Sequence, residues 1–184
     1  MGTKVVIKNV RGAFLHLFEP QVSEEGKPSF GGNFIFSKDH EAYEQMKKAI
    51  REAAVEKWGA KADDVLKSLS AQNKLCLRDG DTKAEYEGFP GNYFVTARNE
   101  VRPIVVDRNR APLTAADGKP YSGCYVVAIL EVWVQDNKYG KRINASLSGV
   151  QFFADGDAFS GGGVAKADDF EDLAVGEENA GDFI

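Results

Sequence analysis

The chain of 184 residues has the length of one compact domain with an appendage. Hydrophobic residues make up 43% and charged residues 28% of it, as in an ordinary soluble globular protein. Two cysteines, Cys76 and Cys124, are too few for a disulfide scaffold and indicate a reducing compartment. The longest apolar run, 124–130, is far shorter than the roughly 20 residues of a membrane span, and residues 1–4 show no signal-peptide pattern. We therefore expect a cytoplasmic protein.

The formal net charge of −5 is unevenly distributed along the chain. Residues 155–184 contain nine acids and one base, for a charge of −8, which leaves +3 on residues 1–154. A Ser-Gly-Gly-Gly tract begins at Ser160, and the residues after it are rich in Asp, Glu, Ala and Gly. We therefore predict a folded domain over 1–154 and a Gly-rich linker with an acidic tail over 155–184. The composition predicts disorder over roughly 158–184.

The first half of the domain has the patterns of two strands followed by two helices. Alternating apolar residues over 3–18 predict a long strand with a bulge at Gly12. After a turn, residues 30–36 predict a second strand that pairs with the first. Apolar residues recur at helical spacing over 40–58, which predicts one long amphipathic helix. A shorter helix is predicted over 63–70, where acids occupy the first turn.

The second half of the domain contains four further strand patterns, over 74–77, 92–98, 122–135 and 142–153. In the third of these, the even-numbered positions are apolar, so this face is predicted to be core. In the second, the alternation assigns Val95 to the core and Phe94 and Arg98 to an outer groove. A mostly β chain with inserted helices and long curved strands predicts a small closed barrel.

Motifs of common catalytic and cofactor sites are missing from the sequence. There is no Gly-rich phosphate loop followed by Lys and Ser or Thr, no G-x-S-x-G elbow and no G-x-G-x-x-G after a strand. The two histidines, His16 and His40, have no cysteine partner at zinc-site spacing. We therefore predict no enzyme activity, no catalytic residue, no cofactor and no metal site.

One enzymatic alternative stays open. Asp79, Asp81, Glu85 and Glu87 cluster near basic residues, and a magnesium-dependent nuclease would use such carboxylates as ligands. Acids in an exposed loop are more often simply solvated, and no His or Lys in an obvious catalytic position accompanies them. A metal-dependent nuclease therefore remains an alternative function, as does a protein-interaction or virion module without affinity for nucleic acid.

Basic and aromatic residues are interleaved along the segments predicted to border the outer face of the barrel. Cations that follow phosphates, together with rings that stack on unpaired bases, are the combination by which proteins hold single-stranded nucleic acid. Each residue alone is more simply explained as a surface charge or a core aromatic, so the prediction depends on their recurrence. The predicted DNA-binding residues are Arg78, Lys83, Tyr86, Phe94, Arg98, Arg102, Trp133, Lys138, Tyr139, Lys141 and Arg142. Duplex DNA stays open as a second ligand, because a basic face does not by itself distinguish single from double strands.

The composition of the acidic tail indicates two roles, competition with DNA and binding of a partner protein. Because it is tethered to a mildly basic body, it competes as a polyanion for the same groove. Apolar residues flanked by acids are also typical of a peptide that docks in a partner's pocket, although a tail that only keeps the protein soluble is the simpler interpretation. The predicted partner-binding residues are Asp168, Asp169, Glu171, Asp172, Asp182, Phe183 and Ile184.

Several segments resemble, in the same order, those of a phage protein family. These segments are 11–20, 77–81, 93–97, 102–109, 121–126, 147–151 and 168–170. Together they cover nearly the whole body of the chain. The sequence is similar to phage single-stranded DNA-binding proteins with an OB-type barrel, a family first catalogued as a domain of unknown function. This family is related to the single-stranded DNA-binding proteins of podophage replisomes.

The resemblance implies a fold and a function. The fold would be mostly β: an OB-fold five-stranded barrel with one long and one short inserted helix and a disordered acidic C-terminal tail. The function would be to coat unpaired DNA, without strong sequence preference, during phage replication or recombination in the cytoplasm of the bacterial host cell. In the wider group an acidic tail regulates DNA access and recruits replication or recombination proteins. Strand annealing and a homodimer are left open.

Overall fold

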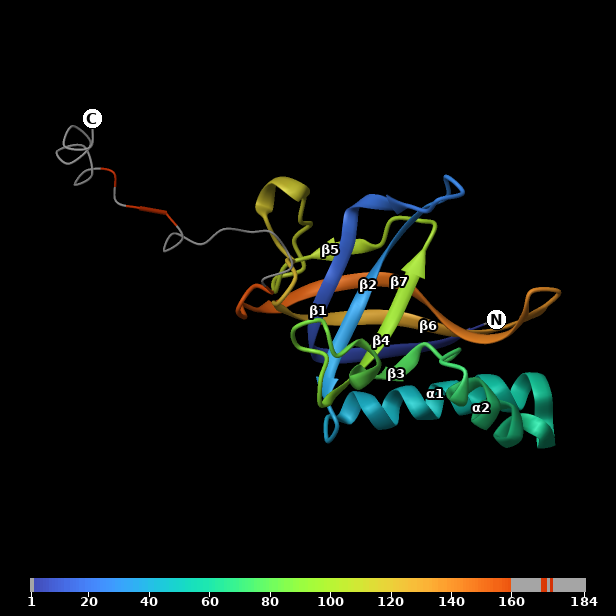
Figure 1. Ribbon diagram of the computed structural model, residues 1–184. Helices are drawn as coiled ribbons and strands as arrows, with labels where there is room; N and C mark the ends of the chain where they lie inside the picture. Colours follow the sequence, from blue (N-terminus) through green and yellow to red (C-terminus); the bar gives the residue numbers. More distant parts are fainter. Residues whose placement is uncertain (1, 160–169, 172, 174–184) are drawn as a thin grey trace, which may run out of the picture.

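The computed structural model describes residues 2–159, 170, 171 and 173 (Figure 1). The strands are β1 (Thr3–Val22), β2 (Pro28–Ser37), β3 (Leu77–Asp79), β4 (Asn92–Asn99), β5 (Ile104–Val106), β6 (Tyr125–Asn137) and β7 (Gly140–Ala154). The helices are α1 (Glu41–Trp58) and α2 (Ala62–Ala71), with the short turns η1 (Gly59–Lys61), η2 (Gly80–Lys83) and η3 (Ala115–Asp117). The one long and one short inserted helix are confirmed. β5 was not predicted, because its three residues are too few to show a pattern.

Five strands close into a barrel. β1 pairs with β2 and β6, β2 pairs with β4, and β6 pairs with β7, all antiparallel. The ring closes where β4 meets β7 in a parallel pairing of Arg98 with Ser146. The short strands β3 and β5 lie at the two ends of the sheet order. The predicted mostly β, five-stranded barrel of OB type is confirmed.

The interior of the barrel follows the period-2 pattern of the sequence. Val126, Ala128, Leu130 and Val132 of β6 are fully buried, as predicted, and Leu147 of β7 joins them in the core. Because successive side chains of a strand point to opposite faces, the odd-numbered positions of β6 face outward. The outer face of β6 is therefore available for contacts other than those of the core.

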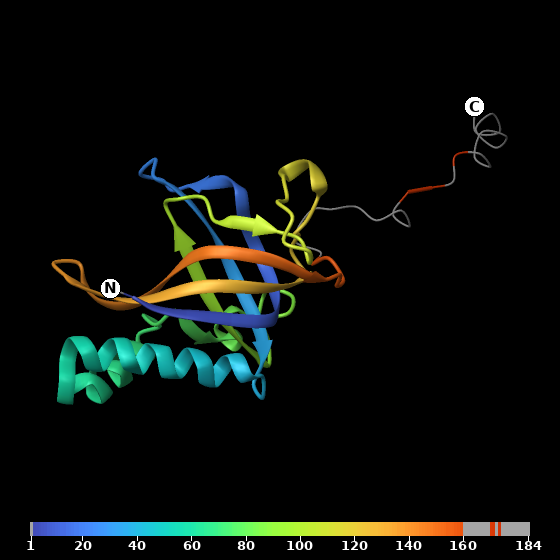
Figure 2. The ribbon, with the colours of Figure 1, turned by 180° about the vertical axis from the view of Figure 1, so that it is seen from behind.

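Helices α1 and α2 cover one end of the barrel (Figures 1 and 2). Helix α1 begins after His40, whose Nδ1 accepts a hydrogen bond from the backbone N–H of Ala42 at 2.9 Å, and it ends at Gly59 with φ of 57°. Met46 and Ile50 on its apolar face are buried in the barrel core. Among the described residues, no helix is long and apolar enough to cross a membrane.

The pairing register of strand β1 shifts at three places, and the two nearest Gly12 lie on either side of it. Its pairing register shifts around Asn9 and around Phe14, which have positive φ values of 55° and 51°. Gly12 itself lies in regular pairing with Phe34 of β2, so the bulge predicted at Gly12 is wrong. The irregularity at Phe14 turns that side chain out of the core, where 41% of its surface is exposed.

The chain stays packed on the barrel as far as Phe159, five residues beyond the predicted domain end at Ala154. Phe159 is buried in a cluster with Phe94, and the Arg11 guanidinium lies over its ring at 4.2 Å from Cζ to the centroid. Arg11 also donates a hydrogen bond to the carbonyl oxygen of Asp157 at 2.6 Å. Disorder was predicted from about residue 158, and this prediction is wrong for Ala158 and Phe159.

The predicted tail residues fall almost entirely outside the described part of the chain. Only Glu171 is described, and it is exposed. The other predicted partner-binding residues, Asp168, Asp169, Asp172, Asp182, Phe183 and Ile184, lie outside the described residues.

Candidate nucleic-acid interface

Two adjoining grooves cross the outer surface around β4. The first, here called the Tyr86 groove, has a volume of about 190 Å³, and its lining includes Phe14, His16, Asn33, Lys83 and Tyr86. The second, here called the Trp133 groove, has a volume of about 470 Å³, and its lining includes Lys74, Arg78, Trp133, Arg142 and Asn144. Both grooves contain Thr96 and Arg98 of β4, so they form one continuous surface.

Four predicted cations line this surface: Arg78, Lys83, Arg98 and Arg142. Among the described residues, none of them forms an ion pair with a carboxylate. Burial lowers the pKa of Arg78, and the charges of Arg142 and Arg98 lower it further. Burial likewise lowers the pKa of Lys83, with Arg78 and Arg98 again contributing. Like charges that depress one another's pKa form a site that a polyanion would stabilise.

The side chain of Arg78 is positioned by two consecutive hydrogen bonds. Its Nη2 donates a hydrogen bond to Thr96 Oγ1 at 3.2 Å, and Thr96 Oγ1 donates to Asn33 Oδ1 at 2.6 Å. The Nε of Arg78 is buried and has no hydrogen-bond partner within the part of the chain that the structure describes. An unpaired buried donor costs about 1–3 kcal/mol, and such a cost is more typical of a binding site than of a purely structural arginine.

Phe94 is buried in the protein under Arg78 and Lys83, and it does not line the groove with them. It is fully buried, it pairs directly with Arg78 across β3 and β4, and the Arg78 Cζ lies 4.9 Å from its ring centroid. The Lys83 Nζ lies 5.5 Å from the same centroid, and Phe89 packs edge-on against the ring. The prediction that Phe94 faces the groove is wrong, because the segment after β3 covers the face that the alternation assigned to solvent.

Three exposed rings line the grooves. Tyr86 and Trp133, both predicted, are 42% and 38% exposed. Phe14, which was not predicted, lies with its ring centroid 5.0 Å from that of Tyr86 at an interplanar angle of 81°. Phe14 and Tyr86 line one groove and Trp133 the other, and Arg98 is common to both. Each groove therefore combines an exposed aromatic surface with shared positive charge.

The floor of the Tyr86 groove is bare backbone at Gly31 and Gly32 of β2. Gly31 pairs with Arg98 across β2 and β4, and a side chain at Gly31 would collide with the carbonyl oxygen of Ala97. Only glycine fits there, and it allows the close approach of β2 and β4 beneath the groove.

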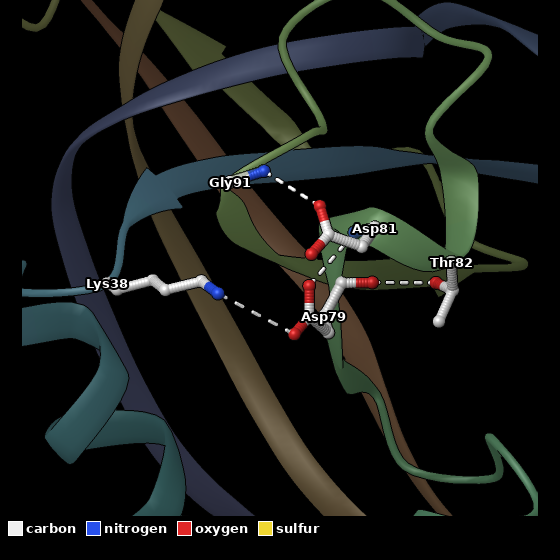
Figure 3. Close-up of polar contacts among 5 residues, drawn as sticks. All are labelled: Lys38, Asp79, Asp81, Thr82 and Gly91. Atoms are coloured by element: carbon white, nitrogen blue, oxygen red, sulfur yellow. Dashed lines mark hydrogen bonds and ion pairs between the residues drawn. The ribbon is translucent and has the colours of Figure 1, made fainter.

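The loop that carries Lys83 and Tyr86 is fastened by two carboxylates (Figure 3). Asp79 Oδ1 accepts a hydrogen bond from the backbone N–H of Asp81 at 2.9 Å, and Asp81 Oδ1 accepts one from Gly91 N–H at 2.9 Å. Asp79 Oδ2 also lies 3.8 Å from Lys38 Nζ. These contacts fix both ends of the loop and thereby place its lysine and tyrosine in the groove.

The same acids were the basis of the nuclease alternative. In residues 2–159, 170, 171 and 173, no group of three His, Cys, Asp or Glu side chains is arranged so that it could hold a metal ion. The hydrogen bonds of Asp79 and Asp81 give these residues a positioning role in the loop. The geometry therefore favours a binding surface over a metal centre at this place.

The remaining predicted DNA-binding residues lie outside both grooves. The Arg102 guanidinium lies over the ring of Phe18 at 5.4 Å, and Lys141 Nζ lies 5.8 Å from the ring centroid of Trp58. The last two, Lys138 and Tyr139, form the turn between β6 and β7. Their role in binding stays a prediction.

The groove-lining residues that sequence reasoning missed include Phe14, His16, Asn33 and Lys74. Phe14 and His16 lie in a strand whose alternation is broken by the bulge, so no period marks them as exposed. Lys74 lies just before β3, at the start of the predicted strand 74–77, and was not assigned to the binding face. A search for bases next to each strand end would have found it.

A small closed β-barrel whose outer groove combines unpaired cations with exposed rings defines a class: proteins that bind single-stranded nucleic acid by phosphate contacts and base stacking. The sequence model of one family in this class, described as "Enterobacter phage Enc34, ssDNA-binding protein", matches residues 3–184. The chain belongs to this family of phage single-stranded DNA-binding proteins. Protein p50 of Acyrthosiphon pisum secondary endosymbiont phage 1 is 50% identical over 179 residues, which cover 95% of this chain and 96% of that protein.

Solved structures agree with the family. The single-stranded DNA-binding protein from bacteriophage Enc34 in complex with ssDNA matches with a TM-score of 0.74 and 27% identity, over 85% of this chain and 89% of that chain. A C-terminal truncation of the Enc34 protein matches with a TM-score of 0.71 and 27% identity, over 85% and 88% of the two chains. The bacteriophage T7 protein gp2.5, also a single-stranded DNA-binding protein, matches with a TM-score of 0.60 and 11% identity, over 94% and 97%, which shows a shared fold. The predicted resemblance is confirmed.

Proposed function

We propose that the protein coats single-stranded DNA, without strong sequence preference, in the replication or recombination of a phage genome inside the bacterial host cell. The observation that carries the proposal is the continuous Tyr86 and Trp133 groove, in which Arg98 connects two aromatic surfaces. Cations along a groove contact the phosphates of any sequence, and exposed rings stack on any base because every base has a flat face, so binding needs no sequence readout. Binding is non-covalent and requires no cofactor.

The acidic tail is part of the proposal. Residues 160–184 contain seven acids and one base, for a charge of −6, tethered close to an uncompensated cation cluster. Tethering keeps the local concentration of such a polyanion high, so it competes with DNA without needing strong intrinsic affinity. When DNA displaces the tail, its acids and apolar residues become available to replication or recombination proteins.

The test is a fluorescence-polarisation titration of oligo-dT and a matched duplex at several salt concentrations. The full chain is compared with a chain that ends after Phe159 and with a full chain carrying Glu177→Gln, Glu178→Gln and Asp182→Asn. We expect salt-sensitive binding that favours the single strand and becomes tighter at low salt in both variants. A full chain that binds neither DNA would reject the function, and unchanged affinity in both variants would reject the competing tail alone.

A further inference from the structure

A third groove, here called the apolar groove, lies on the outer surface of the barrel, apart from the Tyr86 and Trp133 grooves. It has a volume of about 610 Å³ and runs over β5, β6 and β7, with Ile104, Val106, Val127 and Ile129 supplying its apolar lining. None of its lining residues belongs to the Tyr86 or the Trp133 groove. Ile104 is 72% exposed, although it is a β-strand isoleucine next to other apolar side chains. This concentration of exposed apolar surface is typical of an interaction site.

Two exposed apolar residues of the tail match this groove in chemistry. Phe170 is 71% exposed and Leu173 is 74% exposed, three positions apart. Four acids surround them in the sequence, Asp168, Asp169, Glu171 and Asp172. The segment 168–173 therefore consists of two apolar anchors within a cluster of negative charge.

The charges around the apolar groove complement that segment. Lys4 and Arg110 are part of its lining, and among the described residues neither forms an ion pair with a carboxylate. The one acid of the lining, Glu131, accepts a hydrogen bond from the backbone N–H of Gly2 at 3.0 Å. A basic rim around an apolar floor suits an acidic peptide with apolar anchors.

The tail segment is connected to the strand that lines the groove by a short length of chain. Gln151 lines the groove, and Ala154 follows it by three residues, or about 10 Å of extended strand. From there the chain stays on the barrel to Phe159. The ten residues 160–169 form a tether that spans up to about 33 Å when extended.

We propose that the tail segment 168–173 docks on the barrel, with Phe170 and Leu173 in the apolar groove beside Ile104 and Ile129 and its acids near Lys4 and Arg110. This site gives the tail a second position, away from the DNA-binding grooves. Docking reduces the time that the tail spends competing with DNA, so the apolar groove regulates access to the DNA-binding surface. The docking itself does not depend on the proposed DNA-binding function.

The test is methyl NMR of the isoleucine side chains in the full chain. The Phe170→Ala/Leu173→Ala double variant is compared with the unaltered chain and with Phe183→Ala, a control that removes a tail phenylalanine outside the segment. We expect the double variant to shift the Ile104 and Ile129 methyl signals and to leave the Ile143 signal, which reports on the Trp133 groove, unchanged. A synthetic 166–175 peptide added to the double variant should restore the signals, and Ile104→Glu should abolish that response.

Four results would overturn the proposal. Identical Ile104 and Ile129 signals in the double variant and the unaltered chain would show that the segment does not dock there. A shift confined to Ile143 would place the segment in the DNA-binding surface. Shifts at Ile104 that depend on protein concentration and persist in the double variant would assign the groove to a second copy of the chain. Shifts at Ile104 and Ile129 on adding oligo-dT to the double variant would assign it to DNA.

Discussion

The guanidinium of Arg78 lies over the ring of Phe94, its direct partner across β3 and β4, with 4.9 Å between the Arg78 Cζ and the ring centroid. Phe94 in turn belongs to a buried cluster that includes Phe159, the last described residue of the segment that follows β7. Two cations of the candidate binding surface, Arg78 and Lys83, therefore lie over a hydrophobic cluster to which Phe159 contributes. This arrangement links the stability of residues 155–159 to the shape of the binding surface.

Phe159→Ala should lower the free energy of unfolding by about 3–5 kcal/mol, the usual cost of removing a buried phenylalanine ring. A chain that ends after Ala154 should lose a similar amount, whereas a chain that ends after Phe159 should keep the stability of the full chain. Urea denaturation followed by circular dichroism measures all three, with Phe183→Ala as the control. Equal stability of the chains ending after Ala154 and after Phe159 would show that residues 155–159 contribute nothing to the fold.

Arg98→Ala and Arg142→Ala should each weaken binding of oligo-dT and reduce the slope of log affinity against log salt by about one, because each removes one phosphate contact. Arg98 should show the larger loss of affinity, since it lies in both grooves. Lys48→Ala on α1, which also removes one exposed positive charge, is the matched control. The same reduction of slope in the control would mean that net charge, and not the groove, determines affinity.

The sequence predicted the parts of this surface that depend on local pattern. Alternation in β6 correctly separated the buried Leu130 from the outward Trp133, and the recurrence of bases selected Arg78, Arg98 and Arg142, which the structure brings together along one groove. These assignments succeed because a strand's two faces and the exposure of an unpaired arginine are properties of a few neighbouring residues.

The errors arise where distant segments decide the environment. Phe94 was assigned to solvent because its neighbours Tyr93 and Val95 alternate with it, but the ring is covered by Phe89 and Phe159 from elsewhere in the chain. Phe14 was assigned to a strand whose bulge was expected at Gly12, whereas Phe14 itself has a positive φ of 51° and its ring lies against Tyr86. Such a backbone conformation costs about 1–3 kcal/mol and is found where surrounding structure or function requires it, which the local pattern does not record.

Phe14→Ala, Tyr86→Ala and Trp133→Ala should each weaken single-strand binding by about 1–3 kcal/mol, which is about fivefold or more, if each ring stacks on a base. Tyr139→Ala should have a smaller effect, because Tyr139 lies outside both grooves. Polarisation titrations with oligo-dT measure these losses. Stacking on Trp133 should also quench tryptophan fluorescence, and Trp133→Phe should remove that signal. A larger loss for Tyr139→Ala than for the groove residues would move the site to the β6–β7 turn.

Asp81→Ala should weaken single-strand binding several-fold, because the loop of Lys83 and Tyr86 loses the carboxylate that holds Gly91 N–H. Asp81→Asn should restore most of the affinity, since its amide oxygen still accepts that hydrogen bond. Incubation of both variants with labelled single-stranded DNA and magnesium checks the nuclease alternative in the same experiment. Magnesium-dependent cleavage by the unaltered chain that both variants lose would replace the positioning role with a catalytic one.

Lys83 should make DNA binding depend on pH in the alkaline range. Burial and the charges of Arg78 and Arg98 lower its pKa in the free protein. A bound phosphate raises that pKa again, because an opposite charge favours the protonated amine. The contribution of Lys83 is therefore complete below the pKa of the free protein and is lost as pH rises through the higher pKa of the complex, and binding takes up protons between the two.

Isothermal titration calorimetry with oligo-dT, in two buffers of different ionisation enthalpy, measures this uptake directly. We expect net proton uptake in the alkaline range, beginning at a lower pH than that at which an ordinary lysine loses its proton, and none near neutral pH. Lys83→Arg should abolish the uptake and flatten the loss of affinity with pH, because its guanidinium stays charged throughout this range. Lys48→Arg on α1 should leave both unchanged. Uptake that persists in Lys83→Arg would assign the titration to another lysine and remove Lys83 from the phosphate contacts.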